Sequence, residues 1–85
     1  MYILTGSITS ASRLAKAVEK IGGRPASVVH TPSSIHGGGC SYSVRCDDGI
    51  SDFIYDIAKD NGITIKGIYA EKYQDGERVY IDISR

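Results

Sequence analysis

The pattern of apolar and polar positions divides the chain into five strand-like segments and two segments with helical spacing. Alternation or a short apolar run predicts strands at residues 2–5, 25–30, 41–46, 63–70 and 78–83. Alternation is clearest in the third segment, where one side carries Tyr42, Val44 and Cys46 and the other carries Ser41, Ser43 and Arg45. A strand of this kind is half-buried, with its apolar row facing the core.

Two amphipathic helices are predicted between the strands. The first can be capped by Thr9 or Ser10, and the pair Gly22-Gly23 ends it. The second follows the pair Asp47-Asp48, which are good cap residues, and it ends at Asn61-Gly62. The apolar stripes at helical spacing are Ala11, Leu14, Ala15, Val18 and Ile21 in the first helix, and Ile50, Phe53, Ile54, Ile57 and Ala58 in the second.

The order of these elements predicts an α+β fold. Strand, helix, strand, strand, helix, strand and one further strand is the order of a ferredoxin-like βαββαβ sandwich with an appended C-terminal β-strand. We expect residues 1–85 to form this single domain, with Asp75-Gly76 as the turn that joins the last two strands. Both helices would cover one face of an antiparallel sheet. The other face, with Ser41, Ser43 and Arg45, would be open to water or to a partner.

The size and the charge of the chain disfavour several classes of function. A chain of 85 residues has little room for a deep active-site cavity, so a carrier or accessory protein is favoured over a stand-alone enzyme. Ten basic residues balance ten acidic ones, whereas nucleic-acid binders usually carry a basic surplus. Neither a signal peptide nor an apolar stretch of about 20 residues is visible. The sequence therefore predicts a cytoplasmic protein without nucleic-acid or membrane partners.

Both histidines and both cysteines lie in one stretch, HTPSSIHGGGCSYSVRC, at residues 30–46. If residues 41–46 form a strand, Cys40 and Cys46 are roughly 20 Å apart. A disulfide needs Cα atoms within about 7 Å, and cytoplasmic thiols are mostly kept reduced. We therefore do not expect these two cysteines to bond to each other. Cys46 continues the inward row of the strand and is predicted to be structural.

Cys40 is the candidate for chemistry. In the predicted sandwich the first and third strands are antiparallel neighbours, so the loop before the third strand should lie near Gly6, Ser7 and the start of the first helix. A helix N-terminus favours an anion and lowers the pKa of a nearby thiol. The glycine run Gly37, Gly38 and Gly39 can turn its N–H groups toward a sulfur anion. His36 is a candidate partner for the thiolate, and Ser41 completes the predicted binding residues.

The alternative for Cys40 is a buried, inert thiol, which is the usual role of a free cysteine. The glycines would then serve only a tight connection. In that case the chain would be a protein-interaction or regulatory module without chemistry, with Tyr73 and Tyr80 of the terminal hairpin as candidate contact residues.

Metal binding and hydrolase chemistry are disfavoured. His30, His36, Cys40 and Cys46 lack the C-x-x-C spacing of zinc sites, and His30 and Cys46 would lie at opposite ends of two strands. No metal site is predicted. The run His36-Gly37-Gly38-Gly39 matches an oxyanion-hole motif of esterases, but the Gly-x-Ser-x-Gly elbow that works with it is absent from the sequence.

From Tyr2 to about Tyr69 the chain resembles a family of small bacterial domains, the selenium/sulfur carrier protein-like family. The features that carry the resemblance are the opening strand, the Ala/Leu-rich first helix, the Pro32-x-x-Ile35 loop, the pair Gly39-Cys40 and the ending Gly67-Ile68-Tyr69. The family motif has glycine on both sides of its cysteine, whereas Ser41 follows Cys40 here.

This resemblance implies transfer of sulfur or selenium as a persulfide or selenosulfide on Cys40, the position that matches the family's cysteine. It implies no cofactor, because the carried atom is covalently attached. It also implies two protein partners, namely a cysteine desulfurase or selenium-donor enzyme and an acceptor protein. A homodimer through the open sheet face or an edge strand is a further expectation from the predicted fold.

Overall fold

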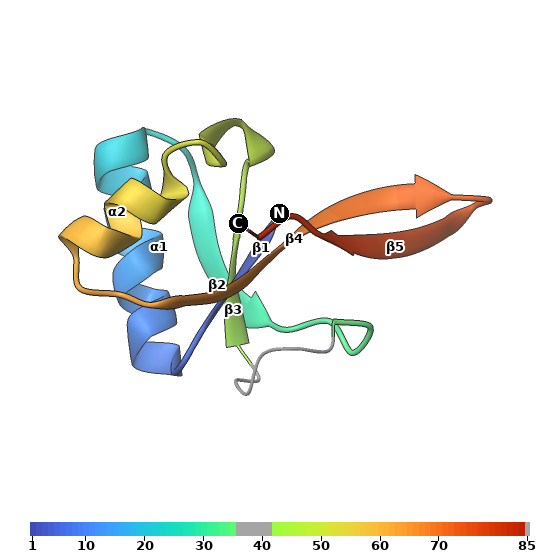
Figure 1. The fold of residues 1–85 in the computed structure, drawn as a ribbon, viewed down its shortest axis with the longest axis horizontal. Helices are drawn as coiled ribbons and strands as arrows, with labels where there is room; N and C mark the ends of the chain where they lie inside the picture. The colour runs from blue at the N-terminus through green and yellow to red at the C-terminus, as the bar shows by residue number, and fades with distance from the viewer. Residues whose placement is uncertain (36–41, 85) are drawn as a thin grey trace.

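The computed structural model describes residues 1–35 and 42–84 and confirms a mixed α+β fold (Figure 1). The strands are β1 (Tyr2–Thr5), β2 (Ala26–His30), β3 (Tyr42–Cys46), β4 (Ile65–Gln74) and β5 (Glu77–Asp82). The helices are α1 (Ile8–Gly22), the 3₁₀ turn η1 (Asp48–Ile50) and α2 (Ile54–Asp60). Every predicted strand lies within a few residues of its expected place. Neither α1 nor α2, the α-helices of the described residues, has the length and apolar character needed to cross a lipid bilayer.

One five-stranded sheet has the order β2-β3-β1-β4-β5, and all its neighbouring strands are antiparallel. The first strand of the chain is therefore the central one, with Tyr2 opposite Arg45 on one side and Tyr69 on the other. This order is compatible with the predicted ferredoxin-like sandwich. The appended strand β5 extends the sheet beyond β4, and the β4–β5 hairpin projects away from the two helices (Figure 1).

The N-cap of helix α1 lies two residues before Thr9, the first of its two expected caps. Ser7, and not Thr9 or Ser10, is the N-cap: its backbone is extended, and its Oγ accepts the N–H of Ser10 at 3.1 Å. The C-terminal end is as predicted, because Gly23 caps it in the left-handed conformation with φ 66°. The prediction of a small polar cap was correct, but the residue was wrong. Several small polar residues are close together here, and any of them could have capped the helix.

The second predicted helix is in fact two elements. Asp47 does act as a cap, since its Oδ1 accepts the N–H of Gly49, but it caps the 3₁₀ turn η1. Helix α2 starts only at Ile54. Phe53 precedes it and is 60% exposed, so the prediction that Phe53 belongs to the buried stripe was wrong. The break in the helix turns this side chain toward the surface.

The main core lies between the helices and one face of the sheet. Strand residues that point to the helices alternate along β1, β3 and β4, as the period of a strand requires. The cluster includes Ile3, Val44, Cys46 and Ile68 from the sheet, Leu14 and Val18 from α1, and Ile54 and Ile57 from α2. The predicted inward positions of Val44 and Cys46 are confirmed.

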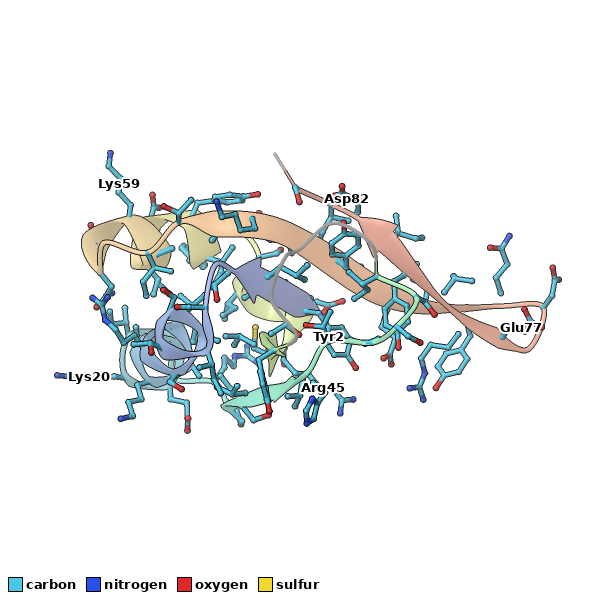
Figure 2. All side chains as sticks on the ribbon, turned by 90° about the horizontal axis from the view of Figure 1, so that it is seen from below. Tyr2, Lys20, Arg45, Lys59, Glu77 and Asp82 are labelled. Carbon is cyan, nitrogen blue, oxygen red and sulfur yellow. The ribbon has the colours of Figure 1, made fainter. Side chains whose placement is uncertain are left out.

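The opposite sheet face is partly covered, in contrast to the prediction that it is open. Ile35, from the segment after β2, is only 8% exposed and packs in a second cluster with Tyr2 and Leu4. Ser43 was expected on a solvated row but is fully buried, and within the described residues its hydroxyl has no hydrogen-bond partner. Arg45 is exposed as predicted, with its guanidinium 5.9 Å from the centre of the Tyr2 ring (Figure 2).

Candidate functional site

The N-terminus of α1 lies at the sheet edge where β1 ends. Thr5 Oγ1 donates to the carbonyl of Ser7 at 2.9 Å, and that carbonyl also accepts the N–H of Ala11 at 3.0 Å. The N–H groups of Ile8 and Thr9, which open the helix, have no acceptor within it because no turn precedes them. The first turn contains no acidic residue. This end of α1 therefore keeps the positive end of its dipole and favours an anion.

Strand β3 begins at the same edge of the sheet. Leu4 lies opposite Ser43, so Thr5 is level with Tyr42, where β3 starts, and Gly6 continues past that point. On the far side of β3, His30 ends β2 opposite Tyr42, and their rings are 4.5 Å apart. Gly6 and Ser7, both predicted site residues, are thus brought to the edge at which β3 starts. The other predicted site residues, namely His36, Gly37, Gly38, Gly39, Cys40 and Ser41, lie outside the described residues.

A bulge in β4 directs Lys66 to this edge. Leu4 lies opposite Gly67 but Thr5 lies opposite Ile65, so Lys66 is the extra residue on β4. A Cβ added at Gly6 would lie 3.7 Å from Cε of Lys66, which shows how closely the lysine stem approaches this glycine. Lys66 was not among the predicted site residues. A signal was present, because a glycine inside a strand, here Gly67, is typical of a bulge.

Cys46, the second cysteine, is a free thiol inside the main core. Its side chain is 8% exposed, and burial raises the pKa of the thiol to about 11, with smaller contributions from Asp48 and Asp47 in the same direction; the N-terminal ammonium acts against them. The ammonium of Met1 also donates to the carbonyl of Cys46 at 2.7 Å. A thiol with a raised pKa is a poor nucleophile near neutral pH. These features fit the structural role predicted for Cys46.

The strand register keeps His30 and Cys46 apart, as the sequence suggested. His30 lies opposite Tyr42, whereas Cys46 lies opposite Ala26 at the other end of the same strand pair. In the part of the chain that the structure describes, no group of three or more histidine, cysteine, aspartate or glutamate side chains could hold a metal ion.

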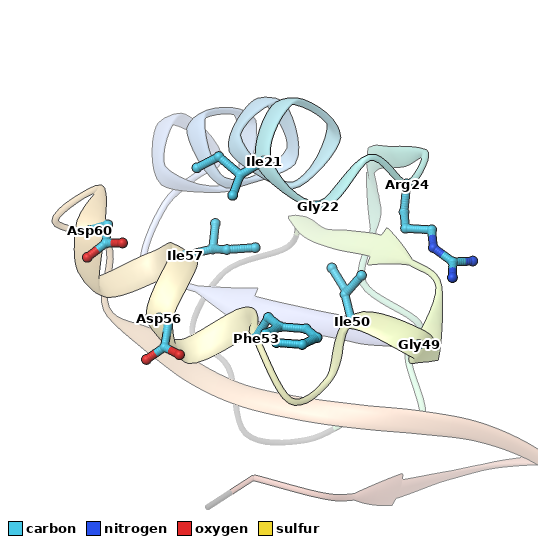
Figure 3. Close-up of a pocket in the computed structure, with 9 residues that line it drawn as sticks. All are labelled: Ile21, Gly22, Arg24, Gly49, Ile50, Phe53, Asp56, Ile57 and Asp60. Carbon is cyan, nitrogen blue, oxygen red and sulfur yellow. The ribbon is translucent and has the colours of Figure 1, made fainter.

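A groove of about 410 Å³ lies at the other end of α1, away from the Gly6-Ser7 edge (Figure 3). Its floor is apolar and comes from three elements: Ile21 of α1, Ile50 of η1, and Ile57 of α2 with the preceding Phe53. Asp56 and Arg24 lie on opposite sides of it, and Arg24 is paired with Asp47 at 3.2 Å. Ile21 and Phe53 are largely exposed, so this surface could contact another protein.

Comparison with known proteins gives one match. Residues 1–70 match the model of a family described as "Putative Se/S carrier protein-like". No curated protein and no solved structure matches the chain. The match begins before β1 and ends at Ala70, where β4 leaves β1 and continues into the hairpin with β5.

Proposed function

Because the chain belongs to the "Putative Se/S carrier protein-like" family, we propose that it carries sulfur or selenium on a single activated cysteine, Cys40. The observation that carries this proposal is the family match, which contains Cys40 within residues 1–70. Cys46 lies in the same match but is buried with a raised pKa, which leaves Cys40 as the thiol for transfer. The proposal includes a ferredoxin-like fold and a cytoplasmic location.

The transfer step is a thiol–persulfide exchange. The thiolate of Cys40 attacks the terminal sulfur of a persulfide, R–S–SH, on a donor protein. A bond forms between Cys40 Sγ and that sulfur, the S–S bond of the donor breaks, and the donor leaves as the thiolate R–S⁻. The product on Cys40 is a persulfide, and the number of S–S bonds is unchanged, so no external oxidant is needed. A selenosulfide forms in the same way from a donor that carries terminal selenium. The proposed donor is a cysteine desulfurase or a selenium-donor enzyme, and a reversal of the step passes the atom to an acceptor protein.

The electrostatics of the Gly6-Ser7 edge support a thiolate. Cys40 precedes Tyr42 by two residues, which span at most about 7 Å. At the Gly6-Ser7 edge the described chain offers the N-terminus of α1 without an acidic first turn, and Lys66, whose stem approaches Gly6 from β4. Both favour the charged form of a thiol and would lower its pKa below that of a free thiol. We propose that His36, Gly37, Gly38, Gly39 and Ser41 complete the surroundings of the carried atom.

Peptide-resolved mass spectrometry after incubation with cysteine and a cysteine desulfurase tests the carrier function. One added sulfur is expected on the peptide that contains Cys40. It should persist in Cys46→Ala and disappear in Cys40→Ser. If no sulfur is added to Cys40 and its alkylation rate follows an ordinary thiol pKa, the carrier proposal is wrong.

The runner-up is a protein-interaction module in which Cys40 is structural. The groove at the end of α1 favours it, because Phe53 and Ile21 expose apolar surface beside charged residues. Two variants, Cys40→Ser and Phe53→Ser, distinguish the interaction module from the carrier. Under the module reading Cys40→Ser keeps partner binding and Phe53→Ser abolishes it, whereas under the carrier reading only Cys40→Ser abolishes sulfur transfer.

A further inference from the structure

Strand β5 leaves one edge of the sheet unpaired. It is the last strand in the order β2-β3-β1-β4-β5, and it belongs to a hairpin that projects beyond the helices (Figure 1). Glu77 lies at the tip of this hairpin and Asp82 near its base (Figure 2). All of β5 also lies beyond the family match, which ends at Ala70. An isolated two-stranded ribbon is marginally stable, and an unpaired edge is a template for another strand.

The turn of the hairpin determines which backbone groups of β5 face the free edge. Asp75 and Gly76 both have positive φ, 53° and 80°, which is the signature of a type I′ turn. The flanking pair, Gln74 and Glu77, is then a hydrogen-bonded pair. Because bonded and non-bonded pairs alternate, every second residue from Glu77 onward bonds to β4. The N–H of Ile83 donates to β4 at 2.9 Å, in agreement with this alternation.

Arg78, Tyr80 and Asp82 consequently present their N–H and C=O groups to the free edge. Their side chains share one face of the hairpin, and Val79 and Ile81 share the other. Hydrogen bonds from the backbone and the hydroxyl of Ser84 lower the pKa of the Asp82 carboxyl, which keeps it anionic. The edge thus carries one cation, one anion and apolar residues within five positions.

This pattern is complementary to itself in one antiparallel register. In a two-fold antiparallel pairing of two β5 strands, residues whose backbone groups face the free edge must lie opposite each other. The residue on the two-fold axis, which lies opposite its own copy, can then be Val79, Tyr80 or Ile81. With Tyr80 on the axis, Tyr80 lies opposite Tyr80 of the second copy and forms a hydrogen-bonded pair with it. Arg78 then lies opposite Asp82, and Val79 opposite Ile81. Centring on Val79 or Ile81 places no opposite charge of the second copy against Arg78 or Asp82, and among the described residues Arg78 then keeps only its 3.8 Å ion pair with Glu71 of the same hairpin. The Tyr80 register is therefore favoured.

We propose that two copies of this chain associate through antiparallel β5 strands, with Tyr80 opposite Tyr80, to form one continuous ten-stranded sheet. Each interface then contains two Arg78–Asp82 pairs and two Val79–Ile81 pairs. The association goes beyond the carrier proposal and does not depend on it, because β5 lies outside the part of the chain that matches the carrier family.

Sedimentation velocity over a range of concentrations tests the pairing. The unmodified chain should be a dimer. Arg78→Glu and Asp82→Lys, each alone, should weaken the dimer by about tenfold or more, because each places like charges opposite each other twice. The double variant should restore the dimer to within a few-fold of the original. The matched control is Lys72→Glu, which changes an exposed charge of the same hairpin on β4 and should leave the dimer unchanged.

Disulfide trapping tests the register in a Cys40→Ser background. A bonded antiparallel pair has Cα atoms about 5.5 Å apart, within disulfide range, so Tyr80→Cys should form a covalent dimer on oxidation. Val79→Cys should not, because a residue and its diagonal counterpart are about 7–8 Å apart. A chain that stays monomeric at all concentrations, single charge variants that dimerise normally, or trapping at position 79 in place of 80 would each overturn the proposal.

Discussion

Alkaline pH should destabilise this protein through the buried thiol of Cys46. The thiol is 8% exposed, and its burial raises the pKa from the ordinary 9.0 to about 11. In the unfolded chain the thiol ionises from about pH 9 upward, whereas in the folded chain it keeps its proton up to about pH 11. The unfolded state therefore binds fewer protons in this window, and stability falls as the pH rises. The contribution of the protonated Cys46 thiol to the free energy of unfolding is fully present below pH 9 and is lost between pH 9 and 11.

The size of the effect follows from the shift in pKa. One pKa unit corresponds to about 1.4 kcal/mol, so a shift from 9.0 to about 11 is worth about 3 kcal/mol of the free energy of unfolding. Near pH 8 the thiolate fraction of Cys46 is about one tenth in the unfolded chain and about one thousandth in the folded chain. Alkylation of Cys46 should therefore be about a hundredfold slower in the folded chain.

Urea denaturation at pH 8, 9, 10 and 11 measures the effect on stability. Cys46→Ala is the control, because Cys40 and other groups that ionise in this range contribute equally to the curves of both proteins. Between pH 9 and 11 the free energy of unfolding should fall more steeply in the unmodified protein than in Cys46→Ala, and the difference should equal the predicted loss. Alkylation with iodoacetamide, followed at the Cys46 peptide, measures the reactivity. Equal pH slopes in both proteins, or equal alkylation rates in buffer and in urea, would refute the reasoning.

Three further changes test the covered sheet face and the hairpin. Ser43→Ala should raise the free energy of unfolding by about 1 kcal/mol, since it removes a buried hydroxyl without a hydrogen-bond partner among the described residues; a lower urea midpoint would mean that the hydroxyl does have a partner. Ile35→Ala should cost about 2–5 kcal/mol in the same assay, because it uncovers Tyr2 and Leu4; a change below 0.5 kcal/mol would show that this face is solvated. Gly76→Ala should cost about 1–2 kcal/mol in thermal unfolding, since its φ of 80° is left-handed; an unchanged midpoint would contradict the type I′ turn.

The sequence was sufficient to predict the strands and their order because their signals are local. The strand predicted over residues 41–46, the Asp75-Gly76 turn and the stripe of α1 each depend on a few neighbouring residues. The structure shows strand β3 at Tyr42–Cys46 and the turn, and it buries the predicted α1 stripe except for Ile21, which is 60% exposed. The errors occurred where distant residues decide the outcome. Ser43 is polar and alternates correctly, yet it is buried between β1 and β2, opposite Leu4 and Val29. Nothing near Ser43 in the sequence indicates this burial.

The second helix shows a different limit of sequence analysis. Apolar residues from Ile50 to Ala58 follow helical spacing well enough to suggest one helix, but the chain forms η1, a turn and then α2. Periodicity alone could not detect this break, because Ile50, Ile54 and Ile57 remain buried on both sides of it. Among the five residues of the predicted stripe, Phe53, which lies at the break, is the exposed one.

Part of the candidate site was predictable from topology. The prediction that β3 starts beside Gly6 and Ser7 required only the antiparallel pairing of β1 with β3, and the register agrees with it. The direction of Lys66 depends on a one-residue bulge that shifts β4 against β1. Such a shift comes from tertiary packing, so the sequence could suggest it through Gly67 but could not specify it.

The central position of β1 has a consequence for how the chain folds. Strand β1 is synthesised before the other four strands of the sheet, but both of its edges are paired only when β4 reaches it. The β4–β5 hairpin needs only a short loop and can form within microseconds, whereas the closure of β1 onto β4 requires a loop that contains most of the chain. Contacts of this range slow folding. A nascent chain that ends before Ile65 therefore carries the apolar strand of Tyr2, Ile3 and Leu4 with one edge unpaired, which is the state most exposed to aggregation.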